Sequence, residues 1–249
     1  MKKSFFVLAA TMVLVIASLW FISCEKEKND EPITVTNQVE DRGNEPSKVF
    51  LPFENPYGQS YTNWTVSWMQ RFMGFNCDKN PFVNPDNALF YQKGQVYFLA
   101  GLSTEGDAIK LTVPQGKAIL FSLVNYINKY PCPNQPMEPK PGQSLEHFLR
   151  AGALKTLADV QGLSVEIDGV PISHLEAYQF TSRLFSFTGN PELASCLDVC
   201  VTGRPQKAVT SGFYLMLKPM SKGLHTLHYR AEIPSINAAQ NGTYYITVI

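Results

Sequence analysis

The chain has 249 residues, of which 45% are apolar, 12% are aromatic and only 17% are charged. Lysine plus arginine and aspartate plus glutamate both number 21, so the formal net charge is zero. Because nucleic-acid binding usually requires a basic excess, the charge balance argues against a nucleic-acid partner. The composition also excludes a collagen, a coiled coil and a chain that is disordered over most of its length.

The first thirty residues have the layout of an export signal. Lys2 and Lys3 precede an uncharged, almost wholly apolar run over residues 5–22, and a highly charged string begins at Glu25. A basic start, an apolar stretch and a small residue at the cut are typical of a secretory signal. The run is also long enough to span a bilayer, so an uncleaved anchor and a cleaved secreted form are the alternatives.

Cys24 favours a third outcome, which is lipidation. Phe21-Ile22-Ser23-Cys24 resembles the bacterial lipobox, where the chain is cut before a diacylglyceryl cysteine, although leucine is usual at the position of Phe21. We therefore expect residues 1–23 to be a lipoprotein signal peptide and Cys24 to be acylated. Two acyl chains suffice for stable anchoring. Since Asp does not follow Cys24, the expected location is the outer membrane, periplasmic or surface-exposed.

The sequence predicts a tether followed by one folded domain. Residues 24–49 are rich in Glu, Lys, Asp and Asn, and they bury too little apolar surface to offset the entropy of ordering. They predict a flexible tether. No second change of composition follows, so residues 50–249 are expected to form a single domain.

Four further cysteines predict disulfide bonds, because an even number is typical of an oxidising compartment. They are Cys77, Cys132, Cys196 and Cys200. Three pairings are possible, and the sequence leaves the choice open: the close spacing of the last two would allow a local Cys196–Cys200 bridge, and Cys77 would then pair with Cys132. Free buried thiols and a metal site are the alternatives, although Cys-x3-Cys matches zinc spacing only loosely.

Apolar periodicity predicts two helices and several strands. Trp64, Trp68, Phe72 and Phe75 form the stripe of a helix within residues 61–75, and a second helix is expected over 144–158. Strands are expected at 95–102, 108–113, 117–126, 163–167, 184–187, 212–218, 224–230 and 243–249. Short strands separated by turns, with two helices, predict a mainly β fold, a β-sandwich with two helical decorations.

Two turns and one loop complete this prediction. Asp168-Gly169 is typical of a tight hairpin turn. The short connection at 219–223 predicts that the strands on either side of it pair antiparallel. Residues 188–210 are expected to be a long loop that carries the two close cysteines. Loops of this length usually have a function or are fastened by a cross-link.

The candidate ligand-binding residues are polar or aromatic side chains near buried elements. An indole face can stack on a sugar or support a pocket, although tryptophans four residues apart on an apolar stripe usually belong to a core. Asparagine and aspartate next to strands contact ligands less often than they bond nearby backbone. The candidates are Trp64, Trp68, Gln70, Asn84, Asp86 and Asn125.

No catalytic residue, metal site or cofactor is predicted. The Gly-x-Ser-x-Gly motif of serine hydrolases is absent. His225 and His228 are three residues apart in a predicted strand, so they point to opposite faces and make a poor ligand pair. Of the other two histidines, His147 and His174, the first lies in a predicted helix and has no His-x3-His partner. Glycoside hydrolysis needs two facing carboxylates. The available ones are Glu105, Asp107, Asp159, Glu166 and Asp168, the last being also a turn former.

The order of several short blocks resembles a family of uncharacterised exported bacterial proteins. The blocks are Trp64-x3-Trp68-x-Gln70, Asn84-Pro85-Asp86, Val96-Tyr97-Phe98-Leu99-Ala100-Gly101, Val113-Pro114-x-Gly116-Lys117-Ala118, Asp168-Gly169, Gly212-Phe213-Tyr214 and Gly223-x-His225-Thr226. The resemblance covers residues 61–249 and implies a secreted, mainly β domain. It implies no activity. The chain departs from the family at its cysteines, since residues 87–92 and 110–112 lack those that relatives carry.

These observations lead to two hypotheses about function. The first is a lipid-anchored cell-envelope protein with a binding or assembly role, whose partners are the membrane, through the N-terminal lipid, and a glycan or an envelope protein. The alternative is a secreted hydrolase that acts on a polysaccharide or a peptide through carboxylates on its loops.

Overall fold

The computed structural model describes residues 47–102, 108–133, 135 and 137–249. The predicted signal peptide, Cys24, most of the predicted tether, Glu105 and Asp107 lie outside the described residues. The folded part begins slightly before residue 50, because Val49 is buried and forms a β-bridge with Leu217. Among the described helices, none is both long enough and apolar enough to cross a membrane.

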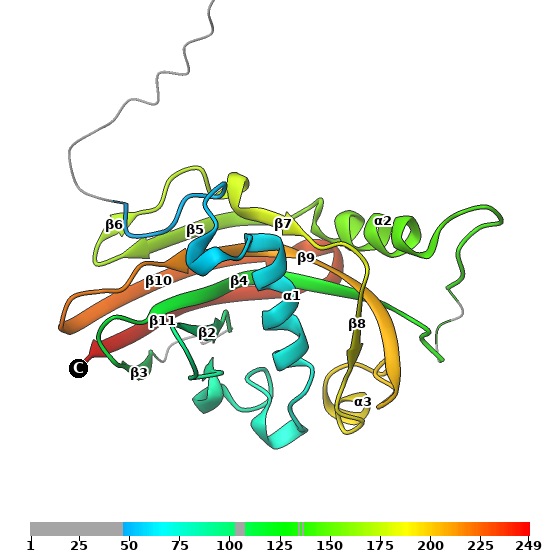
Figure 1. Cartoon of the computed structure of the whole chain (residues 1–249), viewed down its shortest axis with the longest axis horizontal. Coiled ribbons are helices and arrows are strands. Elements are labelled where there is room, and N and C mark those ends of the chain that lie inside the picture. The colour runs from blue at the N-terminus through cyan, green and yellow to red at the C-terminus, as the bar shows by residue number, and fades with distance from the viewer. Residues whose placement is uncertain (1–46, 103–107, 134, 136) are drawn as a thin grey trace, which may run out of the picture. The chain divides into compact units, whose positions relative to one another are not determined.

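The described residues form two mixed sheets with helices around them (Figure 1). The first sheet has the order β1-β2-β4-β9-β7, and β8 also pairs with β9. Its strands are β1 (Leu89–Phe90), β2 (Val96–Ala100), β4 (Ala118–Tyr130), β7 (Gln179–Thr181), β8 (Phe185–Thr188) and β9 (Pro205–Leu217). The second sheet has the order β3-β11-β10-β5-β6. Its strands are β3 (Ile109–Val113), β5 (Gln161–Ile167), β6 (Val170–Pro171), β10 (Gly223–Ile233) and β11 (Ala238–Val248).

The layers follow from which residues meet across the first sheet. On one face, Phe121 of β4 packs against Tyr229 of the second sheet, with the ring centroids 5.0 Å apart. On the other face, Tyr214 of β9 meets Trp68 of helix α1 (Tyr61–Phe72), with the centroids 6.0 Å apart. The first sheet is therefore buried on both faces, whereas the second has one face in solvent. The mainly β, sandwich-like fold with helical decorations is confirmed.

Burial explains the two kinds of strand sequence. Strands β2, β4 and β9 lie between two layers, and each contains a continuous buried run. Strands β5, β10 and β11 alternate between buried and exposed residues, as expected when one face meets water. The apolar runs and the alternating segments of the sequence thus correspond to the two sheets.

Helix α1 is fastened to the first sheet by two buried polar contacts. The Tyr61 hydroxyl donates to the Phe50 carbonyl at 2.8 Å and accepts from the Met216 amide at 3.2 Å. The Trp68 indole nitrogen donates to the Leu99 carbonyl at 3.2 Å. The Ser60 side chain caps the first turn by accepting from the Asn63 amide. These bonds fix the position of α1 along β9.

Two further helices lie at the end of the β4–β9 ribbon. Helix α2 (Leu145–Leu157) buries Leu149 and Ala153 against Val209 of β9. The short helix α3 (Leu193–Cys196) was not expected, and it lies within the segment that the sequence assigned to a loop. That segment also ends early, because β9 begins at Pro205 rather than Gly212. The first half of β9 was missed because polar residues such as Lys207 and Thr210 interrupt its pattern.

The predicted pairing across residues 219–223 is wrong. Strand β9 pairs with β4, β7 and β8, whereas β10 pairs with β11 and β5 in the other sheet. The connection therefore crosses from one sheet to the other. By contrast, Asp168-Gly169 does form the turn between β5 and β6, and both residues have the positive φ angles that such a turn requires.

The four cysteines form two disulfides, as predicted, and the pairing is not the local one that the spacing would allow. The bridges are Cys77–Cys196 and Cys132–Cys200. Asp198 forms an ion pair with Lys129 near the end of β4, which places the following residues beside Cys132. Cys196 is the last residue of α3 and is bonded to Cys77, in the 3-10 helix Cys77–Lys79 that follows α1. Three intervening residues thus send the two cysteines to different partners.

Removing the Cys77–Cys196 bridge should destabilise the domain. The bridge joins residues 119 positions apart, so its loss releases a large loop in the unfolded state. We expect the Cys77→Ser/Cys196→Ser double variant to lose about 2–4 kcal/mol of unfolding free energy. Urea unfolding under non-reducing conditions measures this. An unchanged midpoint and slope, with the second bridge shown intact by mass spectrometry, would contradict the expectation.

Candidate functional site

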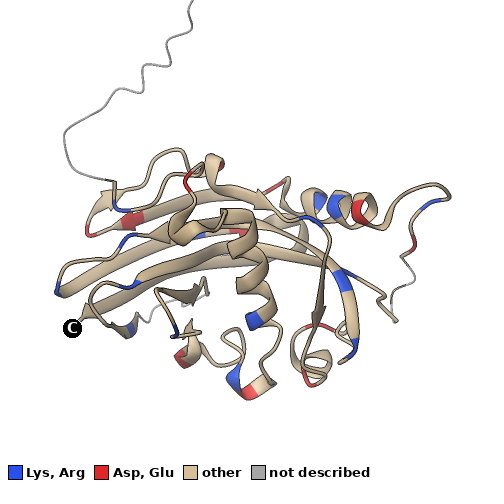
Figure 2. Cartoon of the chain, viewed as in Figure 1, with Lys and Arg blue, Asp and Glu red and all other residues tan. Residues whose placement is uncertain are grey.

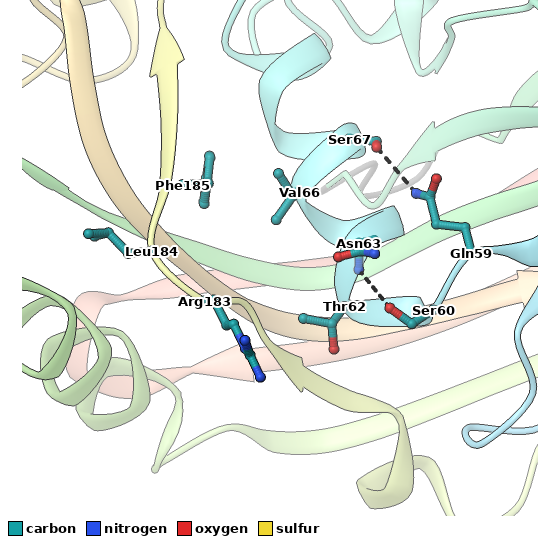
Figure 3. A pocket seen from close by; sticks show the side chains of 9 residues that line it. All are labelled: Gln59, Ser60, Thr62, Asn63, Val66, Ser67, Arg183, Leu184 and Phe185. Carbon is teal, nitrogen blue, oxygen red and sulfur yellow. Dashed lines mark hydrogen bonds between the residues drawn. The ribbon is translucent and has the colours of Figure 1, made fainter.

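A hollow lined mostly by polar residues lies between helix α1 and strand β8 (Figure 3). It has a volume of about 710 Å³. The helix side consists of Gln59, Ser60, Thr62, Asn63, Val66 and Ser67, and the strand side consists of Arg183, Leu184 and Phe185. A second hollow of about 330 Å³ lies further along the same two elements, between Gln70 and residues 186–188. Together we call these hollows the α1–β8 groove.

The helix wall of the groove is a polar stripe. Asn63, Val66, Ser67 and Gln70 are spaced i, i+3, i+4 and i+7, so they lie on one face of α1. The opposite face carries Trp68 and the other core residues. Around this stripe, Gln59 donates to the Ser67 hydroxyl at 3.3 Å. The wall therefore offers amide and hydroxyl groups to a polar ligand while the helix stays docked.

The strand wall is held in place by β9 and by α1. Strand β8 pairs with residues 205–208 of β9, and Gln70 donates its side-chain amide to the Ser186 carbonyl at 2.9 Å. Figure 3 shows Phe185 and Val66 facing each other across the groove, with Arg183 at one end. The two walls are also cross-linked below the groove, because Asn190 donates to the Met73 carbonyl and Cys77 is bonded to Cys196.

The groove is unbalanced in charge. Among its described lining residues, Arg183 is the only charged side chain, and no aspartate or glutamate accompanies it. The Arg183 guanidinium is exposed and forms no ion pair or side-chain hydrogen bond with the described part of the chain. An unpaired guanidinium next to neutral donors and acceptors suits a ligand with a carboxylate or a similar anionic group.

The predicted candidates are distributed over several places, and only Gln70 lies in the groove. Trp68 is fully buried, and Trp64 is half-buried with its indole nitrogen bonded to the Pro56 carbonyl at 3.0 Å. Asn84 caps the 3-10 helix Pro85–Asn87 by accepting from the Asp86 amide. Asn125 donates to the Ser122 hydroxyl at 2.6 Å beside a β-bulge in β4. These contacts are those of core and turn residues.

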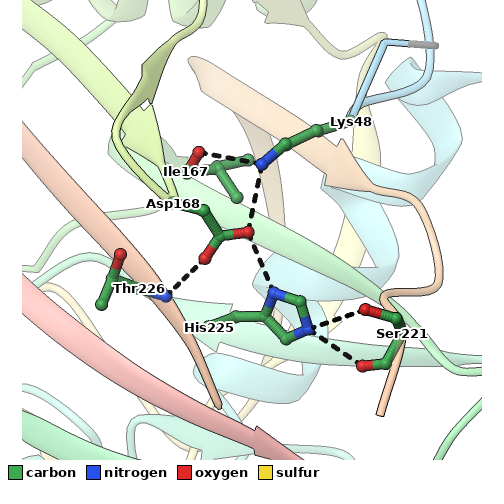
Figure 4. Close-up of polar contacts among 6 residues, drawn as sticks. All are labelled: Lys48, Ile167, Asp168, Ser221, His225 and Thr226. Carbon is green, nitrogen blue, oxygen red and sulfur yellow. Dashed lines mark hydrogen bonds and ion pairs between the residues drawn. The ribbon is translucent and has the colours of Figure 1, made fainter. Parts of the chain in front are cut away.

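A second polar cluster joins the start of the folded part to the second sheet (Figure 4). Asp168 Oδ2 lies 2.9 Å from His225 Nδ1 and 3.1 Å from Lys48 Nζ, and its Oδ1 accepts from the Thr226 amide at 2.9 Å. Partial burial alone would raise the pKa of Asp168, but the hydrogen bonds from His225, Thr226 and Lys48 together lower it.

His225 lies between Ser221 and Asp168, as the histidine of a serine-hydrolase triad lies between its serine and its aspartate. The geometry, however, does not allow His225 to act as the base that takes the serine proton. His225 Nε2 lies 2.9 Å from the Ser221 carbonyl oxygen and 3.5 Å from the Ser221 hydroxyl. A carbonyl oxygen only accepts, so the nearer contact requires a hydrogen on Nε2. A histidine in that state has no lone pair at Nε2 to take the serine proton. The cluster therefore acts as a clamp between Lys48, the β5–β6 turn and β10.

The other carboxylates do not form a catalytic pair within the described residues. Asp159 accepts from both the amide and the hydroxyl of Ser235. Glu166 lies opposite His228 across β5 and β10, away from Asp159. Among the described residues, no group of three or more histidine, cysteine, aspartate or glutamate side chains is arranged to hold a metal ion.

Comparison with protein-family models, with curated proteins and with solved structures finds no match to this chain. The resemblance to exported bacterial proteins therefore stays a prediction, and the site rests on its geometry alone.

The Asp168 clamp should make stability depend on acid pH. A carboxylate whose pKa is lowered by folding stabilises the folded state above its unfolded pKa of about 4, and the contribution is lost as the pH falls through the lower folded value. We expect Asp168→Asn to lower the unfolding free energy by about 1 kcal/mol at pH 7.

The difference between the two proteins should shrink between pH 5 and pH 2, since wild-type Asp168 then becomes neutral as well. Urea unfolding at several pH values measures it. Asparagine tolerates the left-handed backbone conformation at this position and keeps a side-chain oxygen that accepts from the Thr226 amide. The variant therefore tests the negative charge of Asp168 alone. Glu176→Gln, which removes an exposed carboxylate near His174, is the matched control. A difference that stays constant with pH would contradict the assignment.

Proposed function

We propose that this protein is a lipid-anchored component of the bacterial cell envelope that binds a polar ligand in the α1–β8 groove. One observation carries the binding role: a hollow of about 710 Å³ combines an unpaired Arg183 with amide and hydroxyl groups and no carboxylate of its own. Because the described fold gives this exposed guanidinium no carboxylate partner, Arg183 can form a charge-assisted hydrogen bond with an anionic group of a ligand.

The anchoring part of the proposal is supported by the sequence and by the disulfides. The lipobox-like segment ends at Cys24, and two disulfides are typical of proteins outside the reducing cytoplasm. The proposal assigns the polar, highly charged residues that follow Cys24 to the connection between lipid and domain. The groove would then be presented to ligands at the membrane surface.

Hydrolysis is the less favoured reading of the same surface. It would require a reacting pair of carboxylates or an activated nucleophile, and the described residues offer neither at the groove. Turnover of a bound polysaccharide or peptide by the intact domain, abolished by replacing a single acidic residue, would favour the hydrolase.

Lipidation predicts a specific loss in the Cys24→Ser variant. Without the thiol, no diacylglycerol can be attached, so the protein should no longer incorporate a fatty-acid probe and should leave the membrane fraction on washing. Metabolic labelling and fractionation of cells expressing either form measure both effects. Cys24→Ser protein that still takes up the probe would contradict the proposal.

Groove binding predicts that filling the hollow weakens ligand capture. Val66 is half-buried and faces Phe185, so Val66→Phe should obstruct the groove and reduce the affinity of any ligand found at least tenfold. The measurement is a calorimetric titration of a ligand selected from a panel of glycans and peptides. Val170→Phe, at an exposed position of β6 outside the groove, is the matched control. Equal affinities for both variants would place the binding elsewhere.

A further inference from the structure

We infer that the occupant of the α1–β8 groove is an acidic, extended polypeptide segment that adds to the open edge of β8 as a further strand. This inference rests on the proposed function and names its ligand class.

The first observation is that one edge of β8 has no strand partner. Within the described residues, β8 pairs with β9 and with no other strand. An unpaired edge exposes a row of amide and carbonyl groups, and proteins usually protect it with charge or proline. Strand β8 has the sequence Phe-Ser-Phe-Thr, which contains neither. Its edge is therefore suitable for main-chain pairing.

The second observation is that the Gln70 side-chain amide donates to a main-chain carbonyl on this edge, as the amide of a neighbouring strand would. The Ser186 carbonyl accepts from the Gln70 side-chain amide at 2.9 Å, so it is turned towards the groove and not towards β9. In an antiparallel strand the amide and the carbonyl of one residue point to the same side, which places the Ser186 amide on the groove side as well. Both groups can pair with an incoming strand once Gln70 moves aside.

The third observation concerns length. Residues 183–188 span about 17 Å when extended, at roughly 3.3 Å per residue. This matches a peptide segment of about five or six residues. The groove thus has a helix on one side and an open strand edge on the other, and a peptide can add to such an edge with alternate side chains directed into pockets.

The fourth observation is the charge around β8. Three cations lie along it without a carboxylate partner among the described residues: Arg183 in the groove, Arg150 and Lys207. Arg150 donates to the Ser182 carbonyl at 3.1 Å, and Lys207 donates to the Ser186 hydroxyl at 2.8 Å. Figure 2 shows basic positions on α2 and on the part of β9 that runs beside β8. The complementary ligand carries carboxylates.

An anionic polysaccharide would complement the basic side chains around β8, but it has no peptide main chain to pair with the open edge of β8. Sugar binding commonly uses the exposed face of a tryptophan or a tyrosine. The described lining of the groove contains neither, since Trp64 and Trp68 lie outside it. The unpaired main chain of β8 therefore favours the peptide.

The test uses the chain from residue 24 with Cys24→Ser and both disulfides intact, and five labelled probes. These are a heptapeptide of alternating glutamate and valine, its lysine–valine counterpart, the acidic peptide with alternate amides N-methylated in either register, and an oligomer of galacturonic acid. We expect the acidic peptide to bind at least tenfold more tightly than the lysine peptide. Methylation in one register should cost at least tenfold, because it removes the main-chain donors.

Variants of the protein locate the contact. Arg183→Gln should weaken the acidic peptide at least fivefold, whereas Lys155→Gln, on the exposed part of α2, should not. Ser186→Pro removes the groove-side amide and should abolish binding, and Ser186→Ala removes the same hydroxyl while keeping the amide. Hydrogen exchange should show new protection at residues 185–188 when the acidic peptide is bound.

The outcomes separate the inference from the proposed function. If the galacturonate oligomer binds in a way that depends on Arg183 and no peptide binds, the inference of an added peptide strand is overturned. The proposed function, a groove that binds a polar ligand, then stands. Equal binding of native and N-methylated peptides also overturns it. Equal binding of acidic and lysine peptides overturns the charge selection. No binding of any probe to the groove overturns both proposals. If Ser186→Pro does not fold, the N-methylated peptides still decide.

Discussion

The arrangement of this protein depends on strand β9 being paired along both edges and covered on both faces. One edge is taken by β4, and the other is shared end to end by β7 and β8. Ser182, which lies between these two strands, keeps the register because its amide and hydroxyl both bond the Thr210 main chain. Helix α1 and the second sheet then bury opposite faces. Every wall of the proposed site is thus placed by one continuous strand.

The same arrangement explains why the groove can persist as an open feature. A helix beside a sheet edge would tend to close over it, because burying apolar surface is favourable. Here α1 is fixed by Tyr61 and Trp68 at the sheet, and its continuation is tied by the Cys77–Cys196 bridge to the segment that follows β8. Both walls are therefore held by bonds beside the groove and by the Gln70–Ser186 bond within it, while the Arg183 guanidinium stays available to a ligand.

Much of the architecture could be predicted because burial leaves a local record in the sequence. Continuous apolar runs identified β2 and β4, and the stripe through Trp68 identified α1. Pairing left no such record. Strands β9 and β10 are neighbours in sequence but belong to different sheets, and Cys196 and Cys200 diverge because Asp198 is drawn to Lys129. These choices depend on contacts between distant residues, which periodicity and spacing do not contain.

The candidate site was missed for a related reason. Arg183 is an ordinary exposed residue in the sequence, and its importance arises only because α1, more than a hundred residues earlier, brings amides and no carboxylate beside it. Trp64 and Trp68 were candidates because an indole face can stack on a sugar or support a pocket, yet a large aromatic side chain usually adds most to the core. A neutral total charge also conceals a local imbalance, since the carboxylates of Asp168 and Asp198 form ion pairs with Lys48 and Lys129 and not with Arg183. What distinguishes the groove is therefore the lack of a carboxylate partner for Arg183 among the described lining residues. Such a lack can be recognised only when the spatial neighbours of each charged side chain are known.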